Sequence, residues 1–89
     1  MNEPQILKEA IKTFGERKQE EMAVEECSEL ITAISHKHRG RDHNIIEEIA
    51  DVEIMLEQLK IINNCHYQVA MIRKRKIERL SDRIIEKTL

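Results

Sequence analysis

Residues that interrupt helices are scarce in this chain. Among its 89 residues, only Pro4, Gly15 and Gly40 are proline or glycine. The stretches between them contain no repeat and no low-complexity segment, and they consist of residues that favour helix. The sequence therefore predicts an all-α fold, an antiparallel bundle of about four helices, in a single domain over residues 1–89.

These proline and glycine residues set the expected helix boundaries. We expect a first helix from Pro4 to about Phe14 and a second over residues 16–38, which ends before Gly40. A polar connector follows and leads to a third helix at Asn44, which has capping-box spacing to Glu47.

The third helix is expected to end near Ile62, since the following Asn63-Asn64 pair tolerates the left-handed geometry of a tight break. The remaining residues form a fourth helix with one apolar stripe, made of Val69, Ile72, Ile77, Leu80 and Ile84.

The core must be small and aliphatic. Phe14 and Tyr67 are the only aromatic residues, and we expect Phe14 and Cys27 to lie in the core. A chain of this length buries little area per residue, and self-association is a common remedy. We therefore expect a homo-dimer or homo-tetramer.

Charge is divided unevenly along the chain. Residues 1–65 carry 8 Lys/Arg against 14 Asp/Glu, a balance of −6, and residues 66–89 carry 7 against 3, a balance of +4. This division suits a site that binds metal and phosphate at least as well as it suits nucleic acid. The basic run at 73–76 lacks interleaved aromatics, so we do not expect nucleic acid as a partner. The sequence has no signal peptide, membrane-spanning stretch or lipidation motif, so we expect a cytoplasmic protein that does not bind membranes.

Two pairs of carboxylates have helical spacing. Glu26 and Glu29 lie one turn apart on the second helix, and Glu48 and Asp51 lie one turn apart on the third. Glu48 falls within the apolar face of its helix, among Ile45, Val52 and Met55, with Asp51 at the margin of that face. The acids that are expected to point toward solvent are Glu25, Glu47, Glu53 and Glu57.

A cation between the two pairs would explain this arrangement. Antiparallel packing of the second and third helices would let the pairs converge, and four carboxylate donors suit Mg²⁺, or Mn²⁺, rather than zinc. Without metal, at least one acid should have a raised pKa because neighbouring carboxylates resist joint ionisation. Gln19, two turns before Glu26, could donate to a ligand. The four histidines (His36, His38, His43 and His66) are expected at the surface.

At this point the chain resembles the MazG-type all-α nucleoside triphosphate pyrophosphohydrolases. Their Glu-x-x-Glu and Glu-x-x-Asp pattern corresponds to Glu26-Cys27-Ser28-Glu29 and Glu48-Ile49-Ala50-Asp51, with eighteen residues between. The resemblance covers roughly residues 19–60. The closing segment Lys76-x-x-Arg79-Leu80-x-x-Arg83 is similar to the tail of small, phage- or prophage-type members.

The resemblance implies Mg²⁺-dependent cleavage of a (deoxy)nucleoside triphosphate to the monophosphate and pyrophosphate. It implies metal ligation and catalysis by Glu26, Glu29, Glu48 and Asp51, with Glu26 or Glu29 as a candidate base for the attacking water. It also makes Lys76, and then Arg79, candidates for contacting phosphates.

Two main alternatives stay open on the sequence, and a nucleic-acid binder that uses the basic helix over residues 73–83 is a weaker third. Phosphoribosyl-ATP pyrophosphohydrolases share the acid pattern and fold, although their tail is less similar to this one. A non-enzymatic helical module, which binds a partner, metal or nucleotide without turnover, is the alternative from another class.

Overall fold

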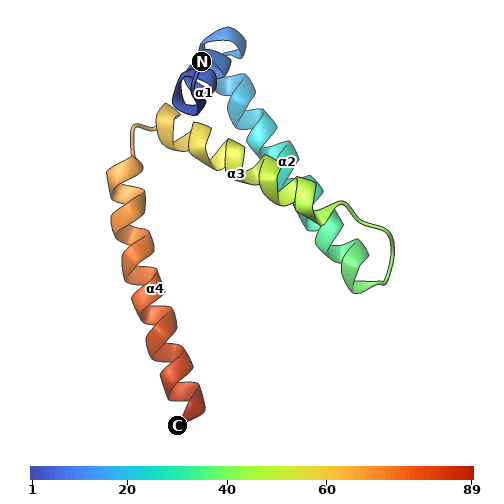
Figure 1. Ribbon diagram of the computed structural model, residues 1–89, viewed down its shortest axis with the longest axis vertical. Coiled ribbons are helices and arrows are strands. Elements are labelled where there is room, and N and C mark those ends of the chain that lie inside the picture. The colour runs from blue at the N-terminus through green and yellow to red at the C-terminus, as the bar shows by residue number, and fades with distance from the viewer.

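The computed structural model describes residues 1–89 and contains four helices and no strand (Figure 1). The helices are α1 (Glu3–Phe14), α2 (Glu16–His38), α3 (Ile45–Ile62) and α4 (His66–Thr88). The prediction of an all-α fold with about four helices is confirmed, and the bounds of the first three helices agree with it to within one residue. No helix combines the length and the apolar character that crossing a bilayer requires.

Local hydrogen bonds and backbone geometry account for the helix ends. At the start of α1, the Gln5 N–H donates to Asn2 Oδ1 at 3.0 Å and the Asn2 N–H donates to Gln5 Oε1 at 2.9 Å. This reciprocal capping box satisfies two N–H groups that have no partner within the helix. Gly15 separates α1 from α2 with φ +94°, which glycine adopts without steric strain because it has no Cβ.

The two ends of α3 differ from each other in how well the sequence predicted them. Asn44 is the N-cap residue, but its side chain makes no capping hydrogen bond, so the predicted capping box with Glu47 is wrong. The Asn44 amide instead donates to the side chain of Glu48. At the other end, Asn64 has φ +48°, which confirms the expected left-handed break before α4.

α2 and α3 pack side by side in opposite directions, and we call this pair the hairpin (Figure 1). α1 packs against both helices at the end of the hairpin remote from the connector. Small side chains at two positions of α2, Ala23 and Ala33, are buried and allow the two helices to approach closely. The other buried residues are Leu7, Gln19, Glu48, Met55 and Gln58.

Two residues that we expected in the core lie at the surface. Cys27 is exposed, and Phe14 is 62% exposed. The side of α2 that faces α3 is centred on Gln19, Ala23 and Ala33. This side is rotated about the helix axis by roughly 50° from the apolar face that we expected to be buried, which includes Cys27. The apolar residues on the adjacent side of α2, among them Val24 and Ile31, lie outside the interface.

α4 packs very little against the rest of the protomer. It contacts only α3 and contains no buried residue. In Figure 1 it leaves the end of α3 and runs away from the hairpin, so the protomer is an elongated molecule of 52 × 37 × 22 Å. The bundle of a single protomer thus consists of α1, α2 and α3, with α4 as an arm.

Candidate metal centre

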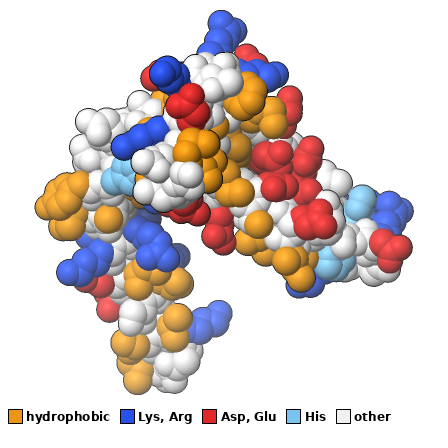
Figure 2. Space-filling model, turned by 45° about the horizontal axis from the view of Figure 1, so that its top comes forward, with side chains coloured by type: hydrophobic (Ala, Val, Ile, Leu, Met, Phe, Trp, Pro, Cys, Tyr) orange, Lys and Arg blue, Asp and Glu red, His pale blue; other side chains and the backbone are white.

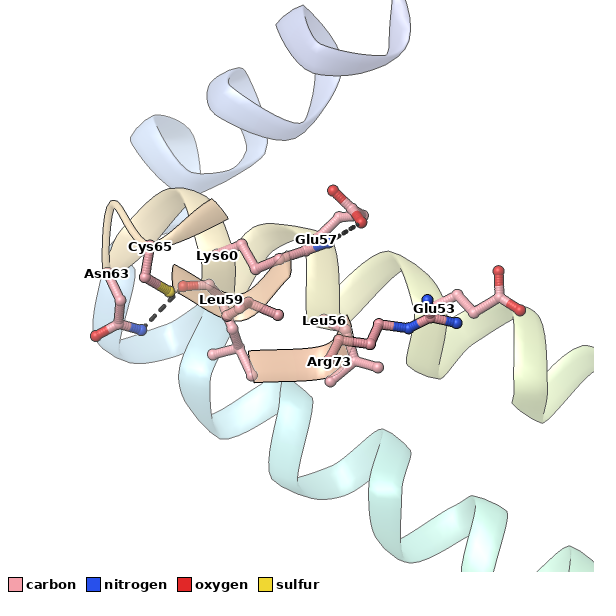
Figure 3. A pocket seen from close by; sticks show the side chains of 9 residues that line it. Glu53, Leu56, Glu57, Leu59, Lys60, Asn63, Cys65 and Arg73 are labelled. Atoms are coloured by element: carbon pink, nitrogen blue, oxygen red, sulfur yellow. Dashed lines mark hydrogen bonds and ion pairs between the residues drawn. The ribbon is translucent and has the colours of Figure 1, made fainter. Parts of the chain in front are cut away.

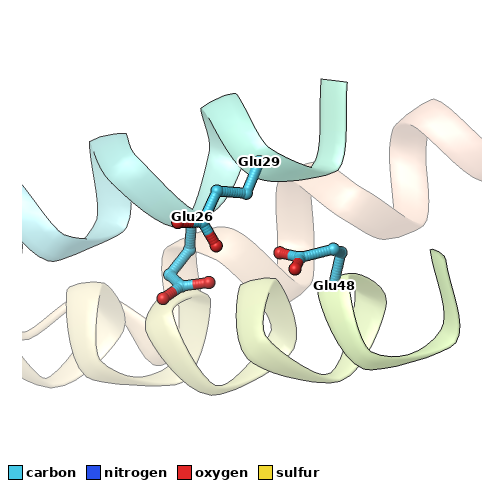
Figure 4. A group of neighbouring side chains, drawn as sticks. All are labelled: Glu26, Glu29 and Glu48. Carbon is cyan, nitrogen blue, oxygen red and sulfur yellow. The ribbon is translucent and has the colours of Figure 1, made fainter. Parts of the chain in front are cut away.

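Three carboxylates from the two helices of the hairpin meet between them. Glu26 and Glu29 extend from α2 and Glu48 extends from α3, and each offers an oxygen within 4.8 Å of the others (Figure 4). Figure 2 shows acidic side chains gathered on one face of the molecule. The structure therefore brings together three of the four acids that the sequence singled out.

Glu48 is the most buried member of the group, with 5% of its surface exposed. This burial confirms the prediction that it faces the interior. Its Oε1 accepts a hydrogen bond of 2.7 Å from Asn44 Nδ2. Its Oε2 is buried and has no hydrogen-bond partner, and the same is true of Oε2 of Glu26. In the ionised state these two buried oxygens accept no hydrogen bond, which is costly without a ligand.

Burial and neighbouring negative charge raise the pKa values of two of these acids. For Glu26, burial raises the pKa above its usual 4.5, and the charges of Glu29, Asp51 and Glu48 raise it further. For Glu48, burial and then the charge of Glu29 raise the pKa, while the hydrogen bond from Asn44 opposes the shift. The sequence-based expectation that at least one acid in the group has a raised pKa agrees with this arrangement.

Asp51 lies at the edge of the group. It is half-buried on α3, one turn after Glu48, and its charge contributes to the raised pKa of both Glu26 and Glu48. No oxygen of Asp51 joins the set of three that lie within 4.8 Å of one another. Asp51 is thus near enough to act on the site through its charge, but it does not join the three converging carboxylates. We call Glu26, Glu29 and Glu48 the glutamate triad.

A pocket of about 340 Å³ opens beside the acids. Its lining residues come from α2 and from the start of α3, and they are Ser28, Glu29, Thr32, Ala33, His36, Asn44 and Glu48. None of them is Lys or Arg. The hydroxyls of Ser28 and Thr32 donate to backbone carbonyls of their own helix, at 3.0 and 3.1 Å. These hydroxyl oxygens can still accept hydrogen bonds from a molecule in the pocket.

Sequence reasoning assigned His36 to the surface and missed its place in this pocket. The side chain is half-buried and lines the pocket together with Glu29 and Thr32. The signal was helical spacing, since His36 follows Thr32 by four residues and Glu29 by seven.

The three expected substrate-binding residues lie outside the acid group. Gln19 is buried and its Nε2 donates to Gln58 Oε1 at 2.7 Å, so one of its two amide N–H groups is already engaged within the hairpin. Lys76 and Arg79 are exposed on α4, which runs away from the hairpin (Figure 1).

The donor set fits a hard divalent cation. All three donors are carboxylate oxygens, and Mg²⁺ and Mn²⁺ prefer oxygen ligands. The group contains no thiolate or imidazole that would favour zinc. The unpartnered oxygens of Glu26 and Glu48 are a separate observation with the same implication. Among known proteins, no family model, curated sequence or solved structure matches this chain.

Proposed function

We propose that this protein is a Mg²⁺-dependent nucleoside triphosphate pyrophosphohydrolase. One observation carries the proposal: three glutamates from two helices converge within 4.8 Å of one another and hold two buried oxygens without partners. The resemblance of Glu26-x-x-Glu29 and Glu48-x-x-Asp51 to the MazG-type pattern supplies the reaction class, which is hydrolysis between the α and β phosphates.

Glu26, Glu29 and Glu48 would hold the cation, with Asp51 adding negative charge beside it. When bound, Mg²⁺ would supply charge neutralisation for the phosphate oxygens and a lowered pKa for a water ligand. In the reaction, a water oxygen bonds to the α phosphorus, the bond from that phosphorus to the bridging oxygen breaks, and pyrophosphate leaves.

One of these glutamates would serve as the base for the attacking water instead of as a metal ligand, and Glu29 is the better candidate. Both α2 acids belong to the group, but Glu29 is exposed and lines the pocket, whereas Glu26 is half-buried and does not line it. A substrate that enters the pocket would meet Glu29 first. The hydroxyls of Ser28 and Thr32 and the imidazole of His36 are the polar groups available to orient the rest of the nucleotide.

An HPLC assay tests the proposal directly. The purified chain is incubated with canonical and modified (deoxy)nucleoside triphosphates, and with phosphoribosyl-ATP, in the presence of Mg²⁺ or EDTA. We expect monophosphate and pyrophosphate from at least one compound, and no products with EDTA. Release of orthophosphate, or equal turnover with EDTA, would contradict the proposed reaction.

One observation favours a second candidate, a module that binds metal or nucleotide without turnover. No Lys or Arg lines the acidic pocket, and cations commonly stabilise the charge that develops during phosphoryl transfer. This candidate predicts that a nucleotide binds in the presence of Mg²⁺ and is recovered intact after prolonged incubation.

A further inference from the structure

A protomer exposes more surface than its mass requires. Its accessible surface is 7435 Å², whereas a compact monomer of 10.5 kDa would expose about 5,400 Å². Its radius of gyration is 16.4 Å, compared with about 12 Å for a compact domain of 89 residues. The excess of about 2,000 Å² per chain is comparable to what each partner buries in a large obligate interface.

Each helix of the hairpin carries a row of exposed apolar residues. On α2, Val24 and Ile31 are each 68% exposed. On α3, Ile49 and Leu56 are exposed and lie two turns apart. Helical geometry puts both rows on the same side of the hairpin, and on α2 this side is opposite Glu29. We call this surface the hairpin apolar face, and it comprises Val24, Cys27, Ile31, Ile34, Ile49 and Leu56.

α4 presents a second unpartnered apolar surface. The residues of its predicted stripe, from Val69 to Ile84, are all exposed. Cations alternate with them, and a groove along the helix is lined by Val69, Ile72, Arg73, Lys76, Ile77, Leu80 and Arg83. The α4 stripe is therefore both apolar and basic.

The start of α4 shows how this stripe relates to the hairpin. A pocket of about 400 Å³ lies at the bend between α3 and α4 (Figure 3), where Val69 of α4 and Leu56 and Leu59 of α3 line the same space. α4 thus begins beside the hairpin apolar face of its own protomer and then runs away from it. Apart from this contact with α3, α4 packs against no other helix of the chain.

Charge favours contact between the two kinds of surface. The hairpin belongs to a segment with a balance of −6, and α4 to one with a balance of +4. Glu20 lies one turn before Val24, and Glu53 lies one turn from both Ile49 and Leu56, so acids border the hairpin apolar face. Pairing α4 with a hairpin brings opposite charges together, whereas pairing two hairpins or two α4 helices brings like charges together.

We propose that two copies of this chain form a two-fold dimer in which α4 of each copy lies on the hairpin apolar face of the other. The 23 residues of α4 form a rod about 34 Å long, which is enough to cover the exposed rows. The acidic pocket lies on the opposite side of α2 and stays open in this dimer. The inference rests on exposed area and charge, and it holds whether or not the protein hydrolyses nucleotides.

Sedimentation of the full chain and of point variants tests the dimer. We expect the unmodified chain to be a dimer at micromolar concentration. Ile31→Glu on the hairpin apolar face and Leu80→Glu on α4 should each give monomers, because each damages both contacts of a reciprocal exchange. Ile54→Glu is the matched control, since Ile54 is also exposed but lies on the other side of α3, and it should stay dimeric.

Mixing the two monomeric variants distinguishes arm exchange from other pairings. In the exchanged dimer, one Ile31→Glu copy and one Leu80→Glu copy share one intact contact, made by the unmodified α4 on the unmodified hairpin. The mixture should therefore dimerise at concentrations at which each variant alone is monomeric. If hairpin paired with hairpin and α4 with α4, the mixed dimer would contain no intact contact, and the mixture would associate no better than its components.

Three results would overturn the proposal: a monomeric unmodified chain, a mixture that associates no better than its components, or a monomeric Ile54→Glu control. Far-UV circular dichroism establishes that each variant keeps its helices. Where one does not, Val24→Glu replaces Ile31→Glu and Ile72→Glu replaces Leu80→Glu, and the same outcomes apply.

Discussion

The Asn44 amide donates to Oε1 of Glu48 at 2.7 Å, while Oε2 of the same carboxylate is buried without a partner. One oxygen is thus held by the residue that precedes α3, and the other is directed into the space between the helices (Figure 4). The N-cap residue therefore positions the acid instead of capping the helix. This relationship links the start of α3 to the proposed function of the site.

We predict that Asn44→Ala weakens binding of Mn²⁺ about 10-fold, a typical effect of removing a group that orients a metal ligand. The substitution removes the hydrogen bond that lowers the pKa of Glu48, so a bound metal would compete with a proton more often. Isothermal titration with Mn²⁺ measures the change. Asn63→Ala is the control, since its amide donates to Leu59 O at the other end of α3. Equal affinities in the two variants would contradict the positioning role.

We predict that Glu48→Gln reduces Mg²⁺-dependent turnover about 100-fold or more, because loss of a metal ligand removes a few kcal/mol of transition-state stabilisation. Without metal, the same variant should melt at a higher temperature than the unmodified chain, since a neutral amide relieves the crowding with Glu26 and Glu29.

The control for this prediction is Glu47→Gln. Glu47 neighbours Glu48 in the chain but is exposed and outside the group. The Glu47→Gln variant should retain turnover and should melt at about the same temperature as the unmodified chain. If Glu48→Gln kept full Mg²⁺-dependent activity, the triad would not be the catalytic centre.

The sequence predicted elements better than their rotation about their own axes. Pro4, Gly15 and Asn64 mark boundaries through local backbone chemistry, so the helices could be placed without tertiary information. Cys27 was placed in the core because it shares a face with apolar residues, yet that face is exposed in the protomer. Which side of an amphipathic helix meets its neighbour depends on the partner helix, and periodicity alone does not contain this information.

In the site, too, some features could be predicted from the sequence and others could not. Glu48 could be identified because an acid in an apolar row is unusual and has a physical implication. The two buried amides, Gln19 and Gln58, gave no comparable signal, since a glutamine tolerates either environment. The position of α4 could not be predicted either, because its apolar stripe indicates that this side is buried but does not indicate which surface covers it. The family resemblance made Lys76 and Arg79 candidates for the site, but within the protomer their helix leads away from it (Figure 1).

We predict that, without metal, the protein is more stable at mildly acidic pH than at neutral pH. Burial and neighbouring charge raise the pKa values of Glu26 and Glu48 above their usual 4.5. Between pH 4.5 and the raised values, the folded state therefore binds more protons than the unfolded state. Stability then decreases as the pH rises through this window.

Melting temperature measured from pH 5 to pH 7.5 in EDTA, at constant ionic strength, tests this pH dependence. Glu48→Gln should flatten the decrease because it removes one of the two groups. Saturating Mg²⁺ should raise the melting temperature most at pH 7.5, where the acids are ionised and bind metal. A melting temperature in EDTA that rises from pH 5 to pH 7.5 would contradict the prediction.

The buried hydrogen bond between Gln19 and Gln58 allows a last prediction, which concerns the hairpin and not the reaction. Gln19 Nε2 donates to Gln58 Oε1 at 2.7 Å, and both side chains are buried. Gln19→Leu should lower the free energy of unfolding by about 1–3 kcal/mol, because it leaves the buried Gln58 amide without its partner. The double variant Gln19→Leu/Gln58→Leu should recover most of this loss, since no unpaired amide remains. Urea unfolding of the single and double variants measures the coupling, and simple additivity of the two losses would show that the amides act independently.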